Sequence, residues 1–139
     1  LENEDVKISL NVLFLFISGL LLLIIGSGIL LVPQAFYASD GVFLGNNPSL
    51  LSEVRASGGM LTGGALVIFA GIIRPALRSL AMMLSILIYG SFGLARLLSL
   101  TIDGMPSHNL IVATVVELTV AAIGITMLYL QPDTRSTVN

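Results

Sequence analysis

Four charged residues of the 139-residue chain lie within or beside long apolar runs. Glu53 and Arg55 precede "ASGGMLTGG", Arg96 follows "YGSFGLA", and Glu117 lies inside "VATVVELTVAA". An unpaired ionised side chain is costly inside a bilayer, so such residues pair with one another or line polar cavities. Residues paired in this way could hold the polar head of a ligand. A buried carboxyl group beside an arginine and Tyr89 could also transfer a proton.

The composition limits the classes of protein to consider. Hydrophobic residues make up 55% of the chain and charged residues only 10%, with a formal net charge of −2. This balance predicts a single membrane domain over residues 1–139 and argues against nucleic-acid binding. Cysteine is absent, so disulfides and thiolate metal sites are excluded. The acidic residues and the single histidine show no metal-ligand spacing, so we expect neither a metal site nor a cofactor.

Four uncharged or nearly uncharged runs are each long enough to cross the ~30 Å hydrocarbon core as a helix. None alternates with the period of a strand. The fold class predicted is therefore all-α, an integral membrane four-helix bundle with antiparallel neighbours. The first run lacks the basic start and prompt cleavage site of a signal peptide, so we expect it to be retained. Prolines and capping residues at the ends of the runs place the helices at about 8–32, 48–73, 76–100 and 109–130.

The basic residues predict an orientation, because Lys and Arg favour the cytoplasmic side. Arg74 and Arg78 flank the short link between the second and third helices, and Lys7 and Arg135 lie near the two termini. All four agree with one topology, in which both termini are cytoplasmic. The long connection over residues 33–47 and the link "DGMPSHN" then face outward. We expect a multi-pass protein of the bacterial inner (cytoplasmic) membrane.

This topology brings the remaining charged residues to the outer end of the bundle. Arg96 lies about 6 Å inside the third helix and Glu117 about 12 Å inside the fourth, at the rise of a helix. Arg55 shares a helix face with Gly59 and Gly63, whose spacing lets membrane helices approach closely. Further along, Arg96 shares a face with Tyr89 and Gly93. We therefore predict a polar network built from Glu53, Arg55, Tyr89, Arg96, Asp103 and Glu117, with helix contacts at Gly59, Gly63 and Gly93.

Each of these residues also has a simpler interpretation. The network formed by Arg55, Arg96 and Glu117 could be purely structural and fix the helix register, or it could bind a ligand. Glu53 could be a solvated carboxylate at a helix N-terminus, and His108 a solvated loop histidine. No residue carries a catalytic motif, so the catalytic set is empty.

The same residues carry a resemblance to a known family. Glu53-x-Arg55-Ala56-x-x-Gly59, Gly63, Gly93-x-x-Arg96-x-x-Ser99, Asp103-Gly104 and Glu117 resemble a family of small bacterial four-helix membrane proteins. That family is described as domain of unknown function 4345 and is similar to the DoxX-like group. The resemblance spans roughly Ile8 to Leu130, and it differs at Gly58, where many members carry an aromatic residue. It implies a fold and a topology but no catalytic residue.

Three function classes follow from these features. Small-residue faces on several helices favour an accessory or assembly subunit, whose partners would be other membrane helices or a homo-oligomer. The one-sided placement of the charges favours the alternative, a pocket that binds a membrane lipid or a quinone from the outer leaflet. A small intramembrane enzyme that uses Glu117 as an acid or base is the third class.

Overall fold

The computed structural model describes residues 2–130, which are helical throughout apart from short connections and contain no strand. Four of the helices are long and apolar enough to cross a membrane, so the prediction of an all-α, multi-pass membrane protein is confirmed. The first helix begins six residues earlier than predicted, and the others begin and end within about two residues of the prediction. The elements are α1 (Glu2–Leu31), α2 (Pro33–Ala38), α3 (Pro48–Ile73), the 3-10 helix η1 (Pro75–Leu77), α4 (Arg78–Ile102) and α5 (His108–Tyr129).

Local chemistry explains where the helices start and stop. The Asn47 side chain accepts hydrogen bonds from the backbone N–H groups of Ser49 and Leu50, at 3.0 and 3.3 Å, and so caps α3. Pro48 follows as the first residue of the helix, where its missing N–H costs nothing. The Ser107 hydroxyl caps α5 in the same way, through the N–H of Leu110.

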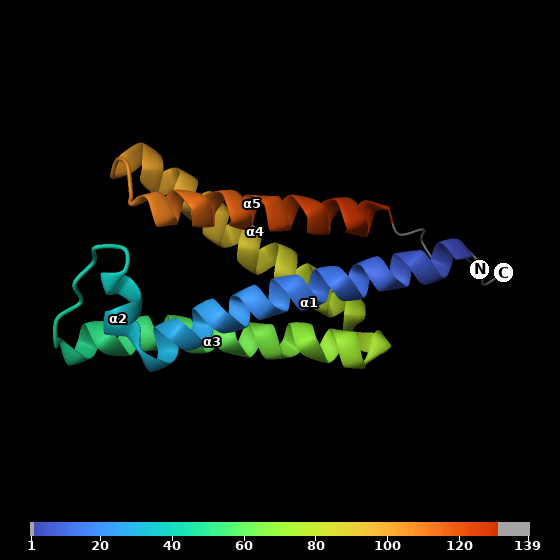
Figure 1. Ribbon diagram of the computed structural model, residues 1–139, viewed down its shortest axis with the longest axis horizontal. Helices are drawn as coiled ribbons and strands as arrows, with labels where there is room; N and C mark the ends of the chain where they lie inside the picture. Colours follow the sequence, from blue (N-terminus) through green and yellow to red (C-terminus); the bar gives the residue numbers. More distant parts are fainter. Residues whose placement is uncertain (1, 131–139) are drawn as a thin grey trace.

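The helices form two antiparallel hairpins. The first hairpin pairs α1 with α3, the second pairs α4 with α5, and α3 also packs on α4 (Figure 1). Contacts between α1 and the second hairpin are far fewer. We call the end that carries α2 and the loops 39–47 and 103–107 the α2 end, and the opposite end the η1 end. The hairpins lie close at the η1 end and are separated toward the α2 end (Figure 1).

Glycine sets the close approach of α1 and α3. A Cβ atom at Gly58 would lie 2.6 Å from the Leu30 backbone nitrogen, and one at Gly26 would lie 2.7 Å from the Thr62 backbone nitrogen. No L side chain larger than hydrogen fits at such distances, so these two positions let the backbones touch.

Within the described chain, Gly59 and Gly63 do not make the close helix contact that was predicted for them. A Cβ at Gly63 would meet nothing within 4 Å, and one at Gly59 would only reach a Leu30 methyl at 4.0 Å. The reason is rotation: α1 packs on the face of α3 that carries Gly58, one residue and about 100° away from Gly59. Gly93 does lie in a contact, because its Cβ would come within 2.7 Å of the Leu118 side chain on α5.

Tyr89 connects the two hairpins. Its hydroxyl donates a hydrogen bond of 2.6 Å to the Ser18 carbonyl of α1. Among residues 2–130 this is the only hydrogen bond between α1–α3 and α4–α5. Around it lies the apolar core, whose most deeply buried members are Leu15, Leu22, Leu61, Ala65, Ile68, Ala81 and Met82.

Candidate functional site

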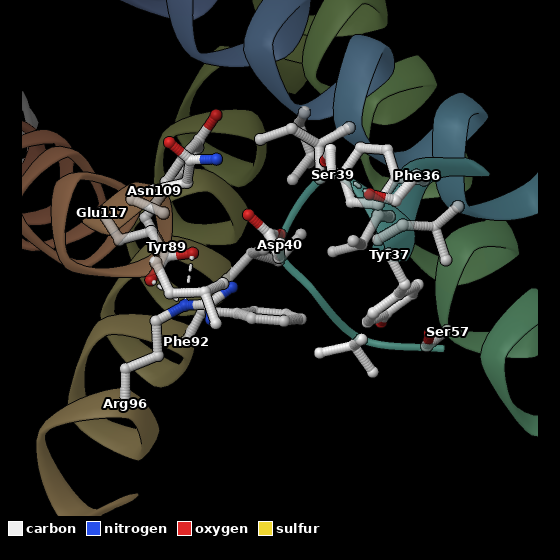
Figure 2. A pocket seen from close by; sticks show the side chains of 18 residues that line it. Phe36, Tyr37, Ser39, Asp40, Ser57, Tyr89, Phe92, Arg96, Asn109 and Glu117 are labelled. Atoms are coloured by element: carbon white, nitrogen blue, oxygen red, sulfur yellow. Dashed lines mark hydrogen bonds and ion pairs between the residues drawn. The ribbon is translucent and has the colours of Figure 1, made fainter. Parts of the chain in front are cut away.

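A cavity of about 420 Å³ lies between the two hairpins at the α2 end. Every helix except η1 contributes to it, and so does the loop after α2, which runs along one side (Figure 2). We call it the α2-end cavity. Its walls are mainly apolar: Leu22, Ile25, Ile29, Phe36, Val42, Leu61, Ile88, Phe92, Leu110 and Ala113.

An ion pair lies in the polar part of this lining. Nε of Arg96 on α4 donates to both carboxylate oxygens of Glu117 on α5, at 3.2 and 3.0 Å (Figure 2). The Glu117 side chain is 11% exposed and that of Arg96 31%, so the pair sits at the boundary between the protein interior and the cavity. This geometry uses one nitrogen of the guanidinium group. The two terminal nitrogens of Arg96 make no hydrogen bond to any residue in the described part of the chain.

Three of the other six polar side chains in the lining, those of Ser39, Ser57 and Tyr89, are already hydrogen-bonded. The hydroxyl of Ser39 donates to the Phe36 carbonyl at 2.6 Å, and that of Ser57 donates to the Val54 carbonyl at 2.7 Å. Tyr89 is engaged with α1, as described above. The side chains of Tyr37, Asp40 and Asn109 have no hydrogen bond to any of residues 2–130, and of these three only Asp40 carries a formal charge, which no ion pair neutralises.

Arg55 lies outside this site. It is an exposed residue whose Nη1 donates to the Leu30 carbonyl, and to the Leu31 carbonyl at 3.3 Å. The last carbonyls of a helix have no partner within it, so Arg55 satisfies the C-terminal end of α1. The prediction that Arg55 joins Arg96 and Glu117 is therefore wrong. The start of α3 lies against the end of α1, and these carbonyls are the nearest acceptors.

Glu53 and Asp103 do not line the cavity either. Glu53 is exposed in the first turns of α3. Asp103 accepts a hydrogen bond of 2.8 Å from the Ser99 hydroxyl, one turn earlier in the chain. Of the six predicted network residues, the cavity contains Tyr89, Arg96 and Glu117.

Five polar residues of the lining were not predicted from the sequence: Tyr37, Ser39, Asp40, Ser57 and Asn109. Tyr37 and Asp40 belong to the long connection between α1 and α3, in which no site residue was predicted. Its length was the available signal, because a connection of that size in a small bundle is often functional. Across residues 2–130, no three His, Cys, Asp or Glu side chains come together as metal ligands would.

Comparison with known proteins gives one match. The model of the family described as Domain of unknown function (DUF4345) matches residues 11–128. The chain belongs to this family. The match covers all of α3 and α4, most of α1 and α5, and both halves of the α2-end cavity. No curated protein and no solved structure matches the chain.

Proposed function

We propose that this membrane protein binds an amphipathic small molecule, such as a lipid or a quinone, in the α2-end cavity. One observation carries the proposal: the cavity combines largely apolar walls with a fixed ion pair at one place in its lining. Ligand sites in proteins typically have this composition, with a volume of a few hundred Å³ and a few polar groups that set orientation. The head of the ligand would lie near Arg96, and its apolar part along Leu22, Ile25 and Ile88.

The accessory-subunit hypothesis has lost its main physical argument. It was based on small-residue faces in excess of what the bundle needs. Several of these glycines lie in contacts within the chain: a Cβ at Gly19 or Gly26 would press on α3, one at Gly93 on α5, and one at Gly124 on α1 and α4. The free part that remains is the Gly63 face of α3, and a stripe of small residues alone does not identify a partner.

We also propose the orientation that the basic residues favour. Arg74 and Arg78 lie at the η1 end, which would therefore be cytoplasmic. The α2-end cavity would then lie in the outer half of the membrane, the inner membrane if the source is a Gram-negative bacterium. Ser107 and Ser79 lie at opposite ends of the bundle, so cysteines placed there test this orientation with a membrane-impermeant thiol reagent. Ser107→Cys should react in intact cells and Ser79→Cys should not.

The binding proposal can be tested by filling the cavity. Ala113 on α5 lines the cavity, so Ala113→Phe would occupy space that is empty and remove no existing polar contact. Ala122 lies on the same helix, is exposed, and does not line the α2-end cavity, so Ala122→Phe is the matched control. Both variants are purified in mild detergent, and bound small molecules are extracted and counted by mass spectrometry.

The expected result is one amphipathic molecule per chain in the wild type and in Ala122→Phe, and its loss in Ala113→Phe at an unchanged melting temperature. A wild-type chain that carries no stoichiometric small molecule, but co-purifies with another membrane protein, would support an accessory subunit instead. Retention of the molecule by Ala113→Phe would show that this cavity is not its site.

A further inference from the structure

The charges that line the α2-end cavity do not balance. Three lining residues are formally charged: Arg96, Glu117 and Asp40. Arg96 and Glu117 neutralise each other at 3.0 Å, which leaves the charge of Asp40 uncompensated. The cavity therefore has a formal charge of −1, and no Lys or Arg of residues 2–130 lies within salt-bridge distance of the Asp40 carboxylate.

The position of Asp40 makes this charge relevant to a ligand. Asp40 is half-buried, on the loop after α2 that lines the cavity. Figure 2 shows it between the labelled side chains of α4 and α5 on one side and those of α2 and α3 on the other. The backbone N–H groups of Asp40 and Gly41 donate to the carbonyls of Tyr37 and Ala38, at 3.0 Å each, so the turn that carries the carboxylate is itself ordered.

Arg96 supplies the complementary chemistry. Only its Nε is used by Glu117, so two terminal N–H₂ groups remain as donors beside the cavity. A ligand that satisfies both residues needs an acceptor oxygen for Arg96 and a cationic hydrogen-bond donor for Asp40. Glu117 already neutralises the positive charge of Arg96, so an anionic head without an amine would gain little net attraction there. The same head would be repelled by the negative charge of Asp40.

We infer that the cavity selects an amphiphile whose head carries a primary amine, with the ammonium group on the Asp40 carboxylate and a neighbouring oxygen on the free nitrogens of Arg96. The inference rests on the proposed function and specifies its ligand class. A phosphoethanolamine head has both groups, and a simple long-chain amine has only the first.

The test compares heads on one acyl chain. Palmitoyl lysophosphatidylethanolamine carries the amine, and palmitoyl lysophosphatidylglycerol has the same chain and phosphate with no amine. Binding of each to the purified protein in neutral detergent is measured by native mass spectrometry. The matched variants are Asp40→Asn and Glu53→Gln, because each removes one carboxylate charge at the α2 end and only Asp40 lines the cavity.

The wild type should bind the ethanolamine lipid about tenfold or more tightly than the glycerol lipid, the size expected for one hydrogen bond to a charged group. Asp40→Asn should bring this ratio close to one, and Glu53→Gln should leave it unchanged. Hexadecylamine, which carries an amine but no phosphate, is then added as a competitor to distinguish recognition of the amine from recognition of the whole phosphoethanolamine head. Competition with the ethanolamine lipid supports recognition of the ammonium group alone, and failure to compete supports recognition of ammonium and phosphate together.

A wild-type ratio near one, or a ratio that Asp40→Asn leaves intact, would overturn the inference, because Asp40 would then be a solvated loop residue. Binding of neither lipid would overturn it as well. The proposed function is decided separately, by whether any amphipathic molecule co-purifies with the wild type and is lost in Ala113→Phe.

Discussion

Two hollows of nearly equal size lie along α1 and α5, and they differ in chemistry. The α2-end cavity has a volume of about 420 Å³, and a groove toward the η1 end has about 400 Å³. The groove, which we call the apolar groove, is lined by Leu10, Leu13, Phe14, Ile17, Ser18, Val120, Ile123 and Met127. Its single polar side chain, Ser18, already donates its hydroxyl to the Leu15 carbonyl.

The difference shows why volume alone does not identify a ligand site in a membrane protein. Lipid tails are as apolar as leucine, so an apolar groove that faces lipid gains little by holding one molecule rather than another. The α2-end cavity instead offers an ion pair, free guanidinium nitrogens and an uncompensated carboxylate, groups that would discriminate between head groups. If the proposed function holds, we therefore expect ligand selectivity to come from the α2 end.

The largest effect should come from the ion pair. Glu117→Ala leaves Arg96 without its partner at the edge of the interior, and should cost about 3 kcal/mol of unfolding free energy, at the low end of the usual range because Arg96 is 31% exposed. Glu53→Ala, an exposed control, should cost almost nothing. Unfolding by SDS in mixed micelles measures both. The double variant Arg96→Leu with Glu117→Leu should lose less unfolding free energy than the separate variants Arg96→Leu and Glu117→Leu added together. Strict additivity would argue against a coupled pair.

A smaller loss is expected where α1 and α3 touch beside the α2-end cavity. Gly58→Ala forces a methyl group against the Leu30 backbone and should destabilise the protein by about 1–3 kcal/mol. Gly63→Ala meets open space and removes a flexible residue from the helix, so it should be neutral or stabilise by up to about 1 kcal/mol. The same unfolding assay separates them. Equal effects at the two positions would mean that α1 does not pack on the Gly58 face of α3.

The hydrogen bond between Tyr89 and Ser18, which lies between the two hollows, should contribute about 1 kcal/mol to the unfolding free energy. Tyr89 lines the α2-end cavity and its acceptor, Ser18, lines the apolar groove. Tyr89→Phe removes this one hydrogen bond and keeps the ring, so a loss of about 1 kcal/mol is expected. Tyr129→Phe is the control, because Tyr129 is 87% exposed. A thermal melt that shows no difference between the two variants would mean that the hairpins are held together by packing alone.

The smallest effect should come from the apolar groove. Ile123→Ala removes a side chain that is 47% exposed, and lipid tails can fill the space, so less than about 1 kcal/mol should be lost. The amount of co-purified amphiphile, counted by mass spectrometry, should stay at the wild-type level. Its loss in Ile123→Ala would make the groove part of the site and remove the contrast between the two hollows.

The helices could be predicted from the sequence because their ends depend on nearby residues. Asn47 with Pro48 starts α3, and the Arg74-Pro75 step ends it, as expected from capping and from the backbone limits of proline. Arg96 and Glu117, expected in one polar network, form an ion pair because they lie on adjacent helices at depths that differ by about one helical turn, which the long arginine side chain spans. Depth along a helix follows from residue number alone.

The rest depended on rotation and on the path of a loop. Gly58 and Gly59 are neighbours that point about 100° apart, and either could have faced α1. The sequence therefore did not determine which face of α3 packs on α1, nor where Arg55 lies relative to Arg96 and Glu117. Asp40 lies in a connection without periodicity, where no pattern predicts which side chains turn inward. Both errors concern the relative placement of elements, which only the packing of the whole chain decides.

The order of the elements along the chain has a consequence for synthesis in the cell. During translation, α1, α2 and α3 are complete before α4 begins, so the first hairpin can close through Gly26 and Gly58 while the ribosome is still active. The cavity lining that belongs to the first hairpin, including Asp40, is then not yet covered by α4 and α5. Glu117 is added only with α5, and until then the guanidinium group of Arg96 lacks the one counter-ion that it has among residues 2–130. We expect a chain truncated before α5 to be the form that membrane quality-control proteases recognise.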